Sequence, residues 1–254
     1  PDGIDRELLR RWNLIKNNLG FELTEDQATA FRDVQKDMMS TTPMNRLIQG
    51  DVGSGKTMVA ALSMMITALM GKQAVLLAPT SVLASQHYRT ISELMENSGM
   101  EPVLLLGKTK ASEKQEIKAK IADGSARVII GTHALLTDDI SFKDLALVIA
   151  DEQHRFGVKQ REKLLFRDTA DDGSVRGVHN LIMTATPIPR TLAMVIYGDM
   201  ATSVIRQKPK GRQEITTWFV NSKKSKAIEE MMSVKLAAGE QVYIVCAKIS
   251  DDEA

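Results

Sequence analysis

Residues 50–57 decide the fold, and they read Gly50-Asp51-Val52-Gly53-Ser54-Gly55-Lys56-Thr57. A short apolar run, Arg46–Gln49, precedes them, and an apolar helical stretch, Thr57–Met70, follows. The spacing G-x-x-x-x-G-K-[ST] between a strand and a helix is typical of a loop whose backbone N–H groups wrap phosphates, with the helix dipole adding positive charge. We therefore predict that the whole stretch binds a nucleotide. Lys56 would neutralise charge on the β- and γ-phosphates, and the Thr57 hydroxyl would ligate Mg²⁺.

Around this loop, short apolar runs alternate with longer helical patterns. The runs are rich in Leu and β-branched residues, as strands buried on both faces are: Arg46–Gln49, Ala74–Ala78, Val103–Leu106, Val128–Ile130, Leu147–Ala150 and Leu181–Thr184. The helical stretches between them include Thr57–Met70, Val82–Asn97 and Ser112–Ala122. This alternation predicts a mainly parallel sheet with helices on both faces, a doubly wound α/β fold. Ahead of it we predict two helices, over Asp5–Leu19 and from Thr24 onward.

The alternation breaks at Arg206–Arg212, a polar and basic segment that contains both Pro and Gly and is typical of a linker. After it we predict a strand over Ile215–Val220, a helix over Lys223–Ala237 and a strand over Gln241–Ala247. We therefore expect one domain over residues 1–208. Residues 209–254 would be a linker and the truncated start of a second α/β domain.

The composition is that of an ordinary soluble protein, with 43% hydrophobic and 26% charged residues among 254. The apolar run Leu62–Met70 is too short to span a membrane, and no signal peptide is visible. The single cysteine, Cys246, excludes an intramolecular disulfide and a thiolate-rich metal site. These features fit a reducing cytosol. The net charge of +1 means that any nucleic acid would have to bind through a local basic stripe.

A phosphate-binding loop needs a carboxylate from a neighbouring strand to hold its metal ion. The apolar run Leu147–Ala150 leads directly into Asp151-Glu152-Gln153-His154. In this interpretation Asp151 coordinates Mg²⁺ through water, and Glu152 orients and deprotonates the attacking water. Together with the loop upstream, the D-E-x-H form resembles the superfamily 2 helicases and translocases, the DEAD/DEAH-box group. The resemblance implies a RecA-like domain that uses ATP and Mg²⁺.

Further stretches resemble motifs of that group in the right order. Residues 78–81 resemble the motif that grips a DNA backbone, and residues 131–135 resemble a second DNA-contacting motif. Residues 184–186, Thr-Ala-Thr, resemble the motif that links hydrolysis to strand movement. The resemblance implies DNA contacts at Thr80, Ser81, Thr132 and His133. It implies coupling roles for Gln153, His154, Thr184, Thr186 and Arg190.

The segment Phe21–Gln27 resembles the Q motif, in which a glutamine recognises adenine through a pair of hydrogen bonds. That resemblance assigns ATP binding to Gln27. The spacing Thr24-x-x-Gln27 is also that of a capping box, in which Gln27 satisfies the backbone of its own helix. Both interpretations stay open at this point.

The flanks of these motifs, Asp151–Val158 and Thr184–Ala193, resemble those of the RecG helicases and of the related translocase Mfd. Gln153, the stretch Tyr197–Met200 and the later Pro209-x-Gly211-Arg212 favour RecG. That resemblance implies a wedge domain followed by two motor domains, of which this chain covers the first and the opening of the second. It implies a monomer that remodels branched DNA, such as stalled forks and four-way junctions, in recombination and repair.

Two alternative functions, one basic segment with two interpretations and one expectation about activity stand beside this resemblance. An Mfd-like double-stranded DNA translocase and a nucleotide-binding regulatory module without DNA activity remain alternatives. The basic residues of Arg206–Arg212 and Lys223–Lys226 form either a DNA-binding stripe or a solvated charge run. Because the arginine fingers of this group lie in the second motor domain, we expect the chain by itself to be nearly inactive.

Overall fold

The computed structural model describes residues 22–152, 177–186, 200–207, 216–220 and 225–245, and a few residues between 10 and 20. The chain divides into two compact units, Pro1–Gly211 and Arg212–Ala254, which are described separately. The helices of the first unit are α2 (Glu25–Met38), α3 (Lys56–Leu69), α4 (Ser81–Leu94), α5 (Ala111–Ala122) and the 3₁₀ turn η1 (His133–Leu136). Its strands are β1 (Asn45–Gly50), β2 (Gln73–Leu77), β3 (Val103–Leu105), β4 (Val128–Gly131), β5 (Leu145–Asp151), β6 (His179–Thr184) and β7 (Ala201–Ile205).

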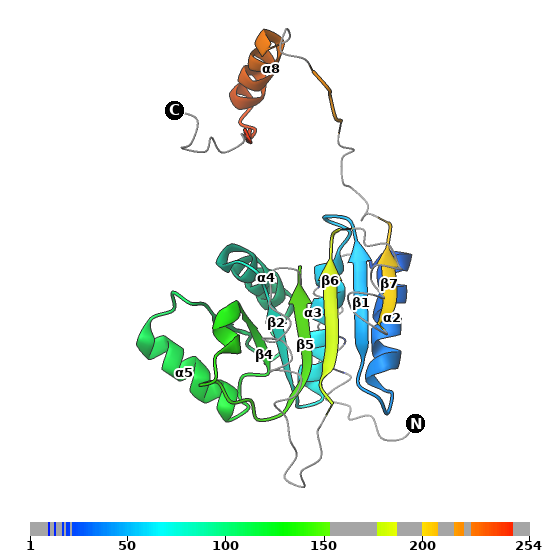
Figure 1. The fold of residues 1–254 in the computed structure, drawn as a ribbon, viewed down its shortest axis with the longest axis vertical. Coiled ribbons are helices and arrows are strands. Elements are labelled where there is room, and N and C mark those ends of the chain that lie inside the picture. The colour runs from blue at the N-terminus through cyan, green and yellow to red at the C-terminus, as the bar shows by residue number, and fades with distance from the viewer. Residues whose placement is uncertain are drawn as a thin grey trace, which may run out of the picture. The chain divides into compact units, whose positions relative to one another are not determined.

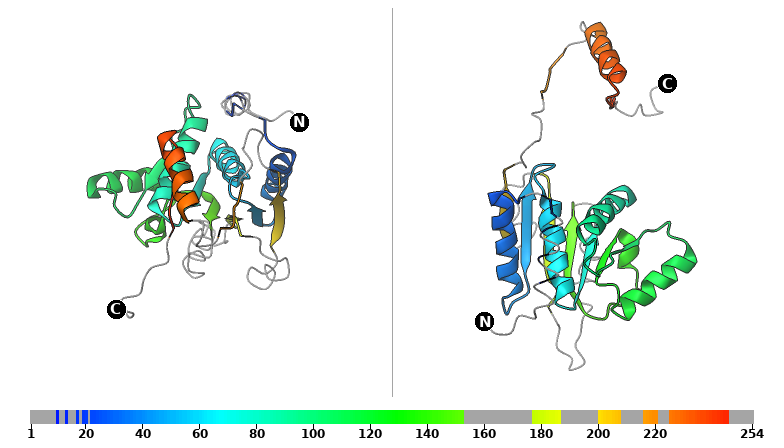
Figure 2. Two further views of the ribbon diagram at one scale, coloured as in Figure 1. Left: turned by 90° about the horizontal axis from the view of Figure 1, so that it is seen from above. Right: turned by 180° about the vertical axis from the view of Figure 1, so that it is seen from behind.

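Within the described residues, the strands form one seven-stranded sheet in the order β3-β4-β2-β5-β6-β1-β7, and every pairing is parallel (Figure 1). Alternate residues of β2 enter different cores. Ala74 and Leu76 pack with α2, α3 and α4, and Val75 and Leu77 pack with α5 and η1. Figure 2 shows α2, α3 and α4 in front of the sheet when it is viewed from behind. Since the central strands are buried on both faces, they read in the sequence as continuous apolar runs. The predicted doubly wound α/β fold is confirmed.

A buried cluster around Arg46 fastens α2 and the edge strand β7 to β1. The Arg46 side chain donates to Asp37 at 2.7 Å and to the Ser203 hydroxyl at 2.7 Å. Ser203 in turn donates to Asp33 at 2.7 Å. Arg46 is 9% exposed, so its charge depends on these partners, because burying an unpaired charge is costly. The cluster fixes α2, which carries Gln27, against β1 and β7.

Two parts of the sequence interpretation need correction. Strand β7 was not predicted, because only Ser203 and Ile205 of it are buried and it lacks a continuous apolar run. In the second unit, the helix is α8 (Ser225–Ala237), as expected, but residues 216–220 and 241–245 are not strands. A strand needs a neighbour for its hydrogen bonds, and none of the described strands pairs with these residues. Most of the predicted helix Asp5–Leu19 lies outside the described residues. No described helix is long and apolar enough to cross a bilayer.

The core contacts of β5 yield a stability prediction. Ile149 is fully buried in the core on β5, a strand that lies between β2 and β6. Ile149→Ala should therefore lower the free energy of unfolding by about 2 to 5 kcal/mol, because it reduces burial and leaves a residual cavity. The control is Val82→Ala on α4, which is 74% exposed and should change stability by no more than about 0.5 kcal/mol. Urea denaturation of both variants measures the difference, and equal losses of stability would contradict this core assignment.

Candidate nucleotide-binding site

The strand register brings the predicted site residues to one edge of the sheet. Gln49 at the end of β1 lies opposite Thr184 at the end of β6. Asp151 at the end of β5 lies opposite Met183 of β6. Because parallel strands end at the same edge, the loops that follow β1, β5 and β6 are neighbours (Figure 1). The phosphate-loop sequence, the Asp151–Glu152 pair and the Thr184–Thr186 segment therefore meet there.

The loop after β1 has the backbone of a phosphate-binding turn. Gly53 and Gly55 have positive φ angles of 74° and 87°, which residues with a side chain rarely adopt. Gly50 has no room for a side chain, because a Cβ atom there would lie 2.5 Å from the Ser54 hydroxyl and 2.8 Å from the Ile205 carbonyl oxygen. Helix α3 begins at Lys56 without a side-chain cap on its first N–H groups. Its N-terminus can therefore receive an anion.

Gln27 braces this loop from α2. Its side-chain nitrogen donates to the Ser54 carbonyl oxygen at 2.7 Å, and its side-chain oxygen accepts from the Thr24 backbone nitrogen at 3.0 Å. The Thr24 hydroxyl accepts from the Gln27 backbone nitrogen, so the capping box is present. Adenine recognition by Gln27 stays a prediction. It would use the second N–H and the second lone pair of an amide that is 2% exposed here.

Lys56 is held by the loop itself. Its ammonium group donates to the carbonyl oxygens of Gly50 at 2.6 Å and Asp51 at 3.0 Å. Partial burial lowers the pKa of Lys56, while the negative charges of Asp151, Glu152 and Asp51 act in the opposite direction. The ammonium group thus lies in the field of the predicted metal ligand Asp151 and the predicted base Glu152. Among the described residues, the buried Ser54 hydroxyl has no hydrogen-bond partner, as expected of a group that awaits a ligand.

Asp151 has a partner that sequence reasoning missed. His87 of α4 lies with its Nε2 atom 2.8 Å from Asp151 Oδ2, and both residues are buried. His87 belongs to the buried stripe of α4, with Ala84, Ile91 and Leu94. A histidine in an otherwise apolar stripe needs a polar partner, and this is the signal that could have singled it out.

Glu152 faces the end of β6. One of its carboxylate oxygens accepts from the Ala185 backbone nitrogen at 2.8 Å and the other from the Thr184 hydroxyl at 3.4 Å. The Thr184 and Thr186 hydroxyls are 2.8 Å apart. Glu152 has a positive φ of 49°, a strained backbone state that is concentrated at functional sites. The structure therefore joins the predicted base directly to the predicted coupling segment. Gln153, His154 and Arg190 lie outside the described residues.

The predicted DNA-binding residues follow β2 and β4 at the same edge. Thr80 caps α4 through its hydroxyl, which accepts from the Leu83 backbone nitrogen at 3.2 Å, and Ser81 is the first residue of that helix. Thr132 is buried at 4% exposure, whereas His133 is exposed. The loop after β3 adds two exposed lysines, Lys108 and Lys110, which the sequence pattern alone does not single out.

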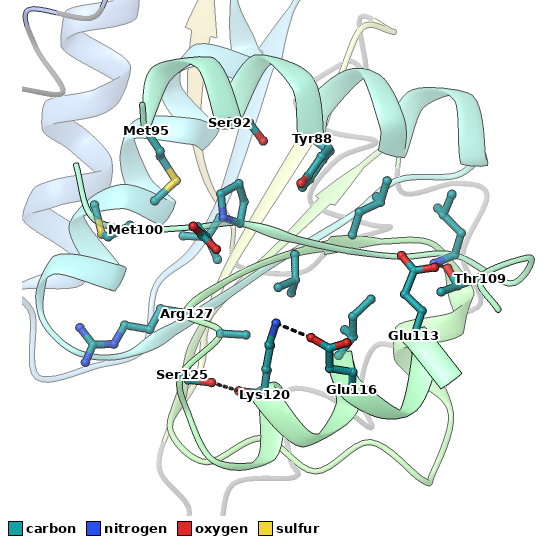
Figure 3. A pocket seen from close by; sticks show the side chains of 18 of the residues that line it. Tyr88, Ser92, Met95, Met100, Thr109, Glu113, Glu116, Lys120, Ser125 and Arg127 are labelled. Carbon is teal, nitrogen blue, oxygen red and sulfur yellow. Dashed lines mark hydrogen bonds and ion pairs between the residues drawn. The ribbon is translucent and has the colours of Figure 1, made fainter. Parts of the chain in front are cut away.

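A separate groove of about 1490 Å³ lies between α4 and α5 over β3 (Figure 3). Tyr88 and Ser92 of α4 line it, together with Met95, the residue that follows this helix. An ion pair between Lys120 and Glu116, at 2.7 Å, borders it on α5. None of the nucleotide or DNA residues predicted from the sequence lines this groove, although Lys108 and Lys110 of the loop after β3 do. The largest hollow described here therefore does not coincide with the predicted nucleotide site.

The chain belongs to the DEAD/DEAH box helicase family, whose family model matches residues 24–195. Within that family it is similar to the ATP-dependent DNA helicase RecG. The identity is 43% over 236 residues with RecG of Thermotoga maritima, covering 93% of this chain and 29% of that protein. It is 43% over 249 residues with RecG of Bacillus subtilis, covering 98% and 35%.

A solved structure of RecG bound to a three-way DNA junction matches with a TM-score of 0.77 and 40% identity, covering 94% of this chain and 31% of that one. The helicase MrfA bound to DNA matches with a TM-score of 0.61 at 19% identity, which supports the fold alone. The chain spans about a third of the length of the curated relatives it matches.

The two possible roles of Gln27 can be separated with two nucleotides. Gln27→Ala removes the brace on the Ser54 carbonyl, so affinities for both ATP and GTP should fall by roughly 3- to 10-fold, about one hydrogen bond. If Gln27 also recognises adenine, as predicted, any preference for ATP over GTP should disappear in the same variant. Calorimetric titration of the complete protein that carries this chain measures both.

The control for this prediction is Thr24→Ala, which removes the helix cap and leaves the amide of Gln27 in place. An unchanged GTP affinity in Gln27→Ala would contradict the brace. A preserved ATP preference would contradict adenine recognition.

Proposed function

We propose that this chain is the first motor domain of an ATP-dependent DNA helicase of the RecG type. The observation that supports this most directly is the convergence of Lys56, Asp151 and Glu152, with Glu152 bonded to the Thr184–Ala185 segment. ATP hydrolysis at this edge would drive movement on branched DNA, such as stalled forks and four-way junctions, in recombination and repair. The similarity to RecG helicases supports the same choice.

The residues at the site fit a nucleoside triphosphate with Mg²⁺. The backbone of Gly50–Thr57 and the Lys56 ammonium group provide positive potential for phosphates, and the Ser54 hydroxyl is unpaired among the described groups. Thr57 and Asp151 would hold Mg²⁺, which usually binds through one or two protein oxygens together with phosphates and water. When bound there, Mg²⁺ would supply neutralisation of the negative charge that develops on the phosphates during hydrolysis.

The two carboxylates would divide the remaining work. Glu152 would orient and deprotonate the attacking water, while the Ala185 N–H and the Thr184 hydroxyl hold the orientation of its carboxylate. A change in the hydrogen bonding of the Glu152 carboxylate during hydrolysis would therefore be passed directly to Thr184 and Thr186. This supports the coupling role expected for those two residues, and we extend that role to Gln153, His154 and Arg190 on the family resemblance.

We propose that DNA binds along the carboxyl edge of β2, β3 and β4. Thr80, Ser81, Thr132 and His133 would contact it, with the N-terminus of α4 directed at a phosphate. Because the net charge of the chain is only +1, DNA binding requires local positive charge. Lys108 and Lys110 would supply it.

We also propose a domain organisation for the complete protein. Residues 1–208 would form the first motor domain and residues 209–254 the start of the second, with a wedge domain elsewhere in a monomeric bacterial cytosolic protein. The second motor domain would complete the ATP cleft with arginine fingers, which are worth about 10³ to 10⁵ in rate. The chain alone would therefore bind nucleotide modestly and unwind nothing.

Two substitutions test the assignment of the nucleotide site in the complete protein. Lys56→Ala should abolish ATP binding or turnover, because it removes the cation that faces the phosphates. Glu152→Gln should leave nucleotide affinity within a few-fold and lower kcat by roughly 10² or more, since it removes the base and keeps the shape. Steady-state ATPase assays and nucleotide titrations distinguish the two. Unchanged turnover in either variant would remove that residue from the mechanism.

A double substitution tests the DNA edge. Lys108→Ala with Lys110→Ala should weaken fork binding and reduce the slope of log affinity against log salt by about 2, because each lysine would neutralise one phosphate. Lys36→Ala is the control, because Lys36 lies in the last turn of α2, just before the amino end of β1. Fluorescence anisotropy on a labelled fork at several salt concentrations gives both slopes. Equal slopes for the double variant and the unmodified protein would place DNA elsewhere.

A further inference from the structure

His87 of α4 and Asp151, the proposed metal ligand at the end of β5, form a buried polar pair. The imidazole Nε2 atom lies 2.8 Å from Asp151 Oδ2, and His87 and Asp151 are 5% and 9% exposed. The two residues are 64 positions apart in the chain, so only the packing of α4 on the sheet brings them together. No step of the proposed hydrolysis uses His87.

The chemistry of the two side chains determines which of them donates the hydrogen bond. An ionised carboxylate only accepts hydrogen bonds, so the imidazole donates from Nε2. This bond occupies Oδ2 and restricts rotation of the Asp151 side chain. Oδ1 is then the oxygen available to a metal-bound water. Residues that orient metal ligands in this way typically change metal affinity by about 10- to 100-fold when they are removed.

The helix that carries His87 also begins at the proposed DNA edge. Thr80 caps α4 and Ser81 opens it. At 1.5 Å per residue, His87 lies about 9 Å along the helix axis from Ser81, within one continuous helix. A shift of α4 on DNA binding would therefore move the imidazole and with it the Asp151 carboxylate.

We propose that His87 is a positioning residue that aligns Asp151 for Mg²⁺ and transmits DNA contact at the start of α4 to the metal site. The proposal rests on the proposed function, because it takes Asp151 as the metal ligand and the start of α4 as a DNA contact. It assigns to His87 an effect on metal requirement rather than a share in bond breaking.

The experiment compares His87→Ala, His87→Gln and the unmodified complete protein. Glutamine can place an N–H close to the position of Nε2, so it should restore the bond. Gln86→Ala, at an exposed neighbour on α4, is the matched control. The measurement is the Mg²⁺ concentration that gives half-maximal binding of the non-hydrolysable analogue AMP-PNP, with and without a synthetic DNA fork. Thermal melting records how far each variant is destabilised.

We expect His87→Ala to raise the half-maximal Mg²⁺ concentration by about 10-fold, the lower end for a residue that orients a metal ligand. We expect His87→Gln and Gln86→Ala to stay near the unmodified protein. In that protein the fork should lower the Mg²⁺ requirement, and in His87→Ala it should not.

An unchanged Mg²⁺ requirement in His87→Ala would overturn the positioning role. A raised requirement that the fork still lowers as much as in the unmodified protein would overturn the link through α4. If His87→Ala fails to fold, the same requirement in His87→Gln as in the unmodified protein supports the proposal, and a rise of about 10-fold in a stably folded His87→Gln overturns it. Failure of the unmodified protein to bind AMP-PNP with Mg²⁺ would instead count against the proposed function itself.

Discussion

The parallel register of β5, β6 and β1 is the constraint on which the site depends. It sets Asp151 opposite Met183 and Gln49 opposite Thr184, so that three loops leave the sheet at one level. The Glu152 backbone nitrogen extends this register by donating to the Met183 carbonyl oxygen at 3.0 Å. A slip of one residue in either pairing would turn the strand over and move the carboxylates away from Lys56. The full burial of Ile149 and Leu181 makes such a slip costly, because those side chains would change faces.

Hydrogen bonds also join the nucleotide loop, through the first turn of α2, to the segment that follows β7. Gln27 links the Ser54 carbonyl to the start of α2. The adjacent Asp26 carboxylate accepts from the backbone nitrogens of Arg206 at 2.8 Å and Gln207 at 2.9 Å. Those N–H groups lower the pKa of Asp26 and keep it ionised. The first turn of α2 therefore touches both the phosphate loop and the segment that leads out of the first unit.

Much of the fold could be predicted because strands buried on both faces leave continuous apolar runs, and because the G-x-x-x-x-G-K-T spacing has few other uses. The edge strand β7 was missed, since a strand with alternating exposure and few apolar residues leaves no such run. The order of the strands along the chain also does not show which strands are neighbours in the sheet. Contacts such as Glu152 with Ala185, or His87 with Asp151, depend on how β5, β6 and α4 pack, which no local spacing reports. Sequence reasoning therefore predicted which groups would react but not which residues hold them in place.

A crystal structure of the complete protein with AMP-PNP and Mg²⁺ would show directly whether the nucleotide binds at this edge of the sheet. In the present structure the Lys56 ammonium group is bonded to the carbonyl oxygens of Gly50 and Asp51. With nucleotide bound, we predict that this ammonium group turns to the β- and γ-phosphates, that backbone N–H groups of residues 53–57 bind the same phosphates, and that Asp151 reaches Mg²⁺ through water. A nucleotide bound elsewhere, for example in the groove between α4 and α5, would contradict this assignment of the site. So would Lys56 retaining both carbonyl bonds with the nucleotide in place.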